Sequence, residues 1–247
     1  MKNAQKDTGH LRNCTAFEQL VLVCSSIGNR YRPSNPSLAL AAISDLSTKA
    51  SQSVNDVMSA LNNYYMAVDQ RSKRFGELPK MATRVLSYFR SCGASAASVS
   101  NVLAYNRKLQ GAQGKTTTEA PAQGAEPVAP APVRSTSQRS FDQQAQHFLS
   151  MVDILVKESS YQPLEEELSV SGLSALHQQL LQSSLAVADA ERLLAAARDK
   201  RNQLLYAEGT GIASLSAFIR AYIRAAFGQN SHEYQQAKIP VIKKQRT

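Results

Sequence analysis

Six closely spaced basic residues between positions 71 and 90 are the best candidates for a chemical role in this sequence. Lysine and arginine side chains attract phosphates and other anions, so a surface that gathers them is a candidate contact for an anion or a nucleic acid. Phe75, Tyr88 and Phe89 lie among them and have rings that can stack on bases. The six basic residues are Arg71, Lys73, Arg74, Lys80, Arg84 and Arg90.

The same residues also have a purely structural interpretation. Basic side chains near the C-terminus of a helix are stabilised by the helix dipole, and aromatic residues within a helix commonly belong to the core. A similar basic group recurs in the second half of the chain, and a short basic tail follows it. The group is formed by Arg198, Lys200, Arg201, Arg220 and Arg224, and the tail by Lys238, Lys243, Lys244 and Arg246. Both interpretations stay open at this point.

Catalytic and metal-binding sequence patterns are absent. The histidines are scattered, and none has the spacing of a metal-binding pair. No glycine-rich phosphate-binding loop occurs, and the consecutive acids Glu165, Glu166 and Glu167 would not face one another on a helix. The four histidines are His10, His147, His177 and His232. We therefore expect no catalytic site, no metal, no cofactor and no small-molecule substrate.

The cysteines and the apolar segments indicate an expected location. Cys14, Cys24 and Cys92 are odd in number and widely spaced, which favours small buried side chains over a disulfide framework or a zinc site. No run of eighteen apolar residues exists, so no membrane span is expected. The first seven residues lack the apolar centre of a signal peptide, and this predicts a cytoplasmic protein.

A composition break divides the 247 residues into two parts. Residues 111–139 are rich in Pro, Ala, Thr and Gln and lack aromatic residues, so they cannot bury enough apolar surface to order themselves. We expect a disordered N-terminus over 1–14, a helical repeat over 15–110, a disordered linker over 111–139, a second helical repeat over 140–238 and a basic tail over 239–247. Residues 1–112 carry 14 Lys/Arg against six Asp/Glu, whereas residues 140–247 carry 11 of each. The first repeat is therefore expected to be basic and the second neutral.

The two halves resemble each other when Tyr31 is aligned with Tyr161, and the offset between matching residues then stays constant. Tyr31-Arg32-Pro33 corresponds to Tyr161-Gln162-Pro163, and the apolar pattern that follows each motif is also shared. The offset persists to Asp69 and Arg71, which correspond to Asp199 and Arg201, and a short insertion in the second half comes later. An offset that holds over some forty residues indicates an internal duplication with one long helix in each copy. We interpret the Asp and Arg that occur at matching positions of both copies as structural residues.

The apolar residues recur at helical spacing almost throughout. No Gly or Pro interrupts residues 37–75, and Asn35-Pro36 suits a helix start. Shorter helices are expected before and after each long helix, with Pro79 at the start of one of them. They cover 15–28, 79–91, 96–110, 141–158, 211–226 and 231–238. The fold class is therefore all-α, with two similar elongated helical bundles, each around one long helix, joined by a disordered linker.

Several motifs resemble a family of bacterial proteins of about this size, with two helical repeats and no characterised function. The motifs are Met81-x-x-Arg84-Val85-Leu86-x-x-Phe89-x-x-x-Gly93-Ala94-Ser95, Ala197-Arg198-Asp199-x-Arg201-Asn202 and Phe227-Gly228-Gln229-x-Ser231-x-Glu233-Tyr234. They are packing and turn motifs, and the resemblance implies no catalytic residues. A looser similarity links the chain to helical proteins of the same bacteria that are labelled as haemagglutinins.

These observations favour a non-enzymatic helical scaffold that self-associates or binds a protein partner. The apolar stripes lie on helices too long for a small bundle to cover completely. A nucleic-acid-associated protein that uses the basic first half is the alternative, and a surface adhesin like the haemagglutinin-labelled proteins is a second alternative.

Overall fold

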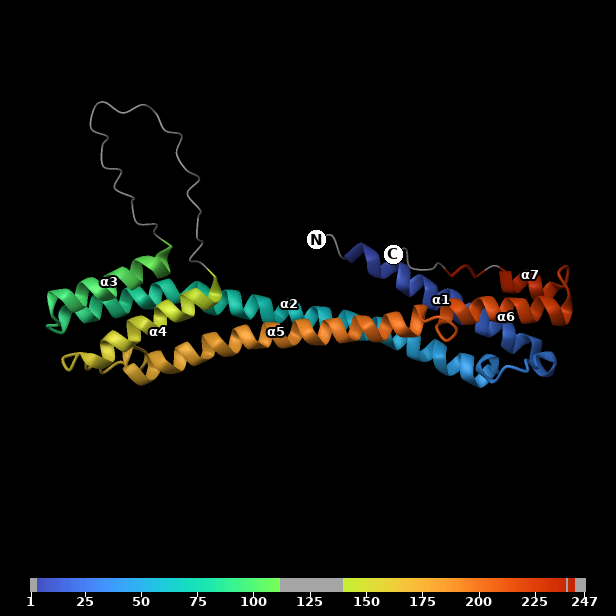
Figure 1. The fold of residues 1–247 in the computed structure, drawn as a ribbon, viewed down its shortest axis with the longest axis horizontal. Helices are drawn as coiled ribbons and strands as arrows, with labels where there is room; N and C mark the ends of the chain where they lie inside the picture. Colours follow the sequence, from blue (N-terminus) through green and yellow to red (C-terminus); the bar gives the residue numbers. More distant parts are fainter. Residues whose placement is uncertain (1–3, 112–139, 239, 243–247) are drawn as a thin grey trace, which may run out of the picture. The chain divides into compact units, whose positions relative to one another are not determined.

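The computed structural model describes residues 4–111, 140–238 and 240–242, and these residues are almost entirely helical with no strand (Figure 1). The prediction of an all-α fold is confirmed. The α-helices are α1 (Ala4–Ile27), α2 (Leu40–Ser91), α3 (Ala96–Gln110), α4 (Phe141–Lys157), α5 (Val170–Tyr206), α6 (Ile212–Phe227) and α7 (His232–Lys238). Three short 3-10 helices, η1 (Gly28–Arg30), η2 (Pro36–Leu38) and η3 (Glu166–Leu168), lie between them.

The chain forms two compact units, and each unit combines segments from both halves of the sequence. Unit 1 consists of Met1–Tyr65 and Asp189–Thr247, and unit 2 consists of Met66–Ala188. The division between units therefore falls within α2 and within α5, not at the predicted linker. Residues 112–139 of that linker lie outside the described residues, as do residues 239 and 243–247 of the predicted tail.

Unit 1 is built around α1. One face of α1 carries Phe17, Leu20 and Cys24, which are fully buried. They belong to a core shared with the start of α2, the end of α5, and α6. The prediction of a disordered segment over residues 1–14 is wrong from Ala4 onward, because the helix begins there and both Asn13 and Cys14 are buried.

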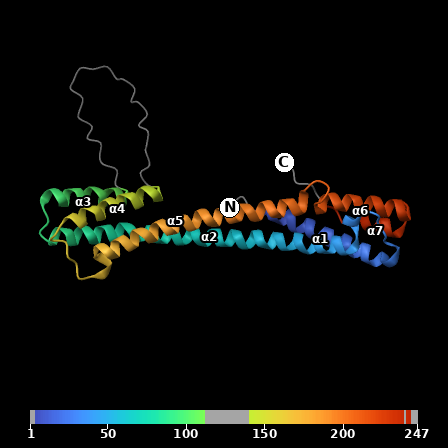
Figure 2. The ribbon, with the colours of Figure 1, turned by 60° about the horizontal axis from the view of Figure 1, so that its bottom comes forward.

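Unit 2 is built around α4, whose residues Phe148, Met151 and Leu155 are fully buried. Their core partners come from the end of α2, from α3 and from the start of α5. α3 and α4 pack against each other, and Figure 2 shows them side by side above the end of α2. The first helix of the second half thus completes its core with the last helices of the first half.

Equivalent contacts recur in the two units at corresponding positions of the two sequence halves. The buried Tyr31 hydroxyl donates a hydrogen bond to the Leu38 carbonyl at 2.9 Å, and the Tyr161 hydroxyl donates to the Leu168 carbonyl at 2.6 Å. The rings of Tyr31 and Tyr222 pack in a T-shaped arrangement with their centres 5.3 Å apart, and the rings of Tyr161 and Tyr88 do so at the same distance. In both units the aromatic partner belongs to the other half of the sequence.

The helix start predicted at Pro79 is wrong, because α2 runs without interruption from Leu40 to Ser91. A proline inside a helix removes one backbone hydrogen bond and costs roughly 3 kcal/mol. Phe75, Leu78 and Ala82 lie on the same side of α2 and are buried, so packing in this stretch outweighs that cost.

In the second half of the sequence, the corresponding long helix, α5, ends at Tyr206 and does not continue into the next helix. The turn between α5 and α6 contains Gly209, whose φ of +74° lies in the left-handed region that favours glycine. A Cβ on Gly211 would lie 2.7 Å from the Ala207 nitrogen, so this close turn also requires glycine. The insertion noted in the sequence is therefore the helix break that separates α5 from α6.

Candidate functional site

Arg71, the first of the six predicted basic residues, is part of the packing of unit 2. Its guanidinium carbon lies 4.3 Å from the ring centre of Phe141 on α4, and that ring in turn meets Phe75 at 4.7 Å. The Nε atom is buried and has no hydrogen-bond partner among the described residues. A cation held against an aromatic ring in this way stabilises the α2–α4 contact.

Three of the other predicted residues also have partners within unit 2. Lys73 pairs with Asp69 at 2.8 Å, and the hydrogen bond and charge of Asp69 raise the pKa of the Lys73 ammonium. Arg74 donates to the Gln179 side chain at 2.8 Å, and Arg84 pairs with Glu167 at 2.7 Å. These pairs are solvent-exposed, so each contributes little to stability.

Lys80 and Arg90 are exposed and have neither a hydrogen bond nor an ion pair with any described residue. Helical spacing places Lys80 on the same face of α2 as Lys73 and Arg84, whereas Arg71 and Arg74 lie on another face. The six residues therefore do not form one surface.

Most of the basic residues of the second half have partners within unit 1. Arg201 is buried, 6% exposed, and donates to the Asn202 side chain at 3.0 Å. Lys200 lies 3.7 Å from Asp56 on α2. Arg220 donates to the backbone carbonyls of Ala237 and Pro240, and so connects α6 to the segment that follows α7.

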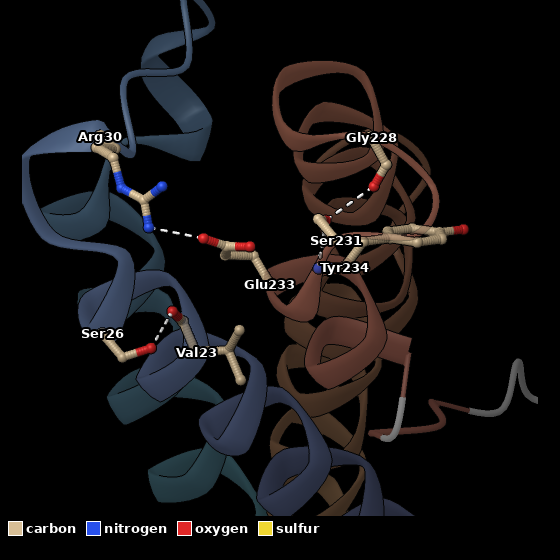
Figure 3. A network of polar contacts seen from close by, with 7 residues as sticks. All are labelled: Val23, Ser26, Arg30, Gly228, Ser231, Glu233 and Tyr234. Carbon is tan, nitrogen blue, oxygen red and sulfur yellow. Dashed lines mark hydrogen bonds and ion pairs between the residues drawn. The ribbon is translucent and has the colours of Figure 1, made fainter.

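A further polar network joins the two halves of the sequence in unit 1 (Figure 3). Arg30, directly after α1, pairs with Glu233 of α7 at 2.6 Å, and its guanidinium also lies over the Phe227 ring at 5.3 Å. A hydrogen bond from the Glu233 backbone, together with Arg30, lowers the pKa of that carboxyl. Ser231 caps α7 by accepting a hydrogen bond from the Tyr234 backbone. These are structural contacts that sequence reasoning did not predict.

Uncovered apolar side chains are the feature that most needs a functional explanation. In unit 1, Met58 and Tyr65 on α2 are 52% and 57% exposed, and Leu193 on α5 is 49% exposed. In unit 2, Leu185 on α5 is 69% exposed and Met66 on α2 is 60% exposed. From Met58 to Arg74, α2 contains no buried residue. The shorter helices of each unit therefore leave this part of the predicted stripe open.

The described part of the chain contains no cluster of metal-binding side chains. No three His, Cys, Asp or Glu side chains there are close enough to hold a metal ion. The buried His10 contacts the Tyr206 hydroxyl at 2.7 Å, which gives it a structural role. No helix in the described ranges is long and apolar enough to cross a membrane.

In comparisons with known protein families, with curated proteins and with solved structures, the chain has no match.

Proposed function

We propose that this protein is a non-enzymatic helical scaffold that associates with protein, in the first place with further copies of itself, through the exposed apolar side chains of α2 and α5. The observation that carries the proposal is the set of large apolar side chains that these helices leave uncovered. Scattered exposed apolar residues are common on proteins, whereas grouped ones mark interaction surfaces.

Three of the exposed apolar residues of unit 1, Met58, Tyr65 and Leu193, lie at one level of α2 and α5. Met58 and Tyr65 lie seven residues apart, which places them on one face of α2 two turns from each other. α5 runs antiparallel to α2 in this unit (Figure 1), with Lys200 beside Asp56. Leu193 precedes Lys200 by two turns, so it lies at the level of the Met58–Tyr65 stretch. Methionine and tyrosine suit such a surface because they adapt to a partner and offer a large contact area.

The proposal also includes an origin by internal duplication within the bacterial two-repeat family, and a cytoplasmic location. The constant offset between the halves and the recurring Tyr31 and Tyr161 contacts support the duplication. The motifs around Gly93 and Gly228 support the family.

Light scattering over a range of protein concentrations tests the self-association. We expect a mass above 26.9 kDa that falls on dilution. The double substitution Met58→Glu with Tyr65→Glu should shift the protein toward the monomer, because two charges would have to be buried in the contact. Asn63→Glu is the matched control, since Asn63 is exposed on another face of the same helix. A monomer at every concentration, with no partner recovered from cells, would contradict the proposal.

Nucleic-acid binding is the second candidate function, and the shared face of Lys73, Lys80 and Arg84 favours it. Retention on immobilised DNA or RNA should then fall steeply as salt is raised. Lys80→Ala should weaken it without changing stability, because Lys80 has no partner among the described residues. Absence of retention at low salt would remove this candidate.

A further inference from the structure

A groove of about 630 Å³ lies in unit 1 between the start of α2 and the end of α5. Its apolar wall is formed by Leu46, Leu204 and Ala207. The polar residues Lys49, Gln52, Lys200 and Gln203 also line it. The size falls within the usual range of small-molecule sites, about 300–1,000 Å³, and so does the combination of an apolar wall with a few polar groups.

The groove depends on residues that differ between the two copies of the repeat. At the equivalent positions of the other copy, Leu204 corresponds to Arg74 and Lys49 corresponds to Gln179. In unit 2 those two side chains are joined by a hydrogen bond of 2.8 Å that bridges α2 and α5. In unit 1 a leucine and a lysine cannot make this bridge. The turn after α5, which is the insertion of the second half, contributes Ala207 and Thr210 to the end of the groove.

The charges around the groove favour an anion. Two lysines and no acidic residue are among the described residues that line it. Lys49 pairs with Asp45 at 2.6 Å and Lys200 lies 3.7 Å from Asp56, and all four side chains are more than a third exposed. Such exposed pairs are worth little, so either ammonium can turn to a ligand at small cost.

We propose that this groove binds an aliphatic carboxylate, with its hydrocarbon chain against Leu46, Leu204 and Ala207 and its carboxylate between Lys49 and Lys200. The apolar wall accounts for the chain, and the two lysines that line the groove account for the charged end. An acyl chain without a charge would leave the amines unused, and a small anion would leave the wall uncovered. Binding therefore requires both parts of the ligand.

Calorimetric titration of the 247-residue chain with decanoate, below the micelle concentration of decanoate, tests the site. Decanol and acetate provide the comparison, and we expect each to bind at least about tenfold more weakly than decanoate, since each lacks one of the two contacts. Equal binding of decanol would overturn the role of the lysines, and no binding of decanoate would overturn the site.

The sharpest variant transfers the bridge of unit 2 into unit 1. Lys49→Gln combined with Leu204→Arg reproduces the Arg74–Gln179 pair and should close the groove, with loss of decanoate binding. Lys73→Gln is the matched control, because Lys73 forms the same exposed pair with an aspartate four residues earlier but lies in unit 2. Lys49→Gln with Lys200→Gln keeps the wall and should weaken binding about tenfold.

Helix content and unfolding midpoint, measured for each variant, separate loss of the site from loss of the fold. Decanoate binding that survives both double substitutions would overturn the proposal. The readout is independent of self-association, so failure of the groove leaves the scaffold proposal untouched.

Discussion

Two tyrosines fix the start of the long helices through the same hydrogen bond. Tyr31 and Tyr161 are buried, and each hydroxyl donates to a carbonyl seven residues later. Tyr31→Phe and Tyr161→Phe should each lower the free energy of unfolding by about 1–3 kcal/mol, because a buried carbonyl loses its donor. Urea unfolding measures this, and Tyr65→Phe is the control because Tyr65 is exposed. A loss of stability in only one of the two variants would contradict equivalent roles for the two tyrosines.

The cysteines should differ in reactivity. Burial raises the pKa of both Cys14 and Cys24 to about 11, so little reactive thiolate forms near neutral pH. Cys92 is only half-buried and lies at the end of α2. We expect one fast-reacting thiol in the folded protein at pH 8 and three after denaturation, as followed with a chromogenic disulfide reagent. Cys92→Ser should remove the fast phase, and a fast phase that persists in this variant would contradict the buried positions.

At the scale of the elements, two glycines within the long helices should respond in opposite ways to alanine. A Cβ on Gly76 in α2 would meet nothing within 4 Å, so Gly76→Ala should stabilise the protein by about 0.5–1 kcal/mol through the lower flexibility of the unfolded chain. A Cβ on Gly172 in α5 would lie 2.1 Å from the Glu166 carbonyl oxygen, so Gly172→Ala should destabilise it. Thermal unfolding of both variants measures the difference. Destabilisation by Gly76→Ala would mean that α2 is not a continuous helix at this point.

Local sequence patterns predict most helices here but not where the long ones end. Apolar spacing and the glycines near residues 93 and 228 place α3, α4, α6 and α7 to within a few residues. The helix start predicted at Pro79 is wrong because the cost of a proline within a helix is local. The burial of Phe75 and Leu78 that offsets this cost depends on α4 and α5, which are distant in the sequence. The candidate site was less predictable for the same reason. Arg71 looks like a surface charge in the sequence, and only the position of Phe141 reveals its packing role.

At the scale of the whole molecule, the positive charge is divided between the two units differently from how it is divided between the two halves of the sequence. By sequence the first half is basic and the second is neutral, but both units contain parts of both halves. Unit 1 carries 16 Lys/Arg against nine Asp/Glu, and unit 2 carries 12 against ten. The excess of positive charge therefore belongs to unit 1, which also contains the lysine-bordered groove. No local pattern predicts this, because it follows from which helices pair over long distances in the chain.

The exchange of helices between halves makes a direct prediction for a chain that is cut. A protease site placed within residues 112–139 of the 247-residue chain allows cleavage between α3 and α4. The two fragments should stay together after cleavage, because α1 packs with α6 and α7 while α4 packs with α3. The contacts of Tyr31 with Tyr222, and of Tyr161 with Tyr88, also join the fragments.

Size-exclusion chromatography before and after cleavage measures this outcome, with helix content followed by circular dichroism. The cleaved protein should elute at the position of the intact one, keep its helix content and separate into two fragments only in denaturant. Two bundles that each fold from one half of the sequence would instead separate into folded fragments under native conditions. A fourfold dilution series distinguishes a tight complex from a weak one, because only fragments with few mutual contacts would come apart on dilution.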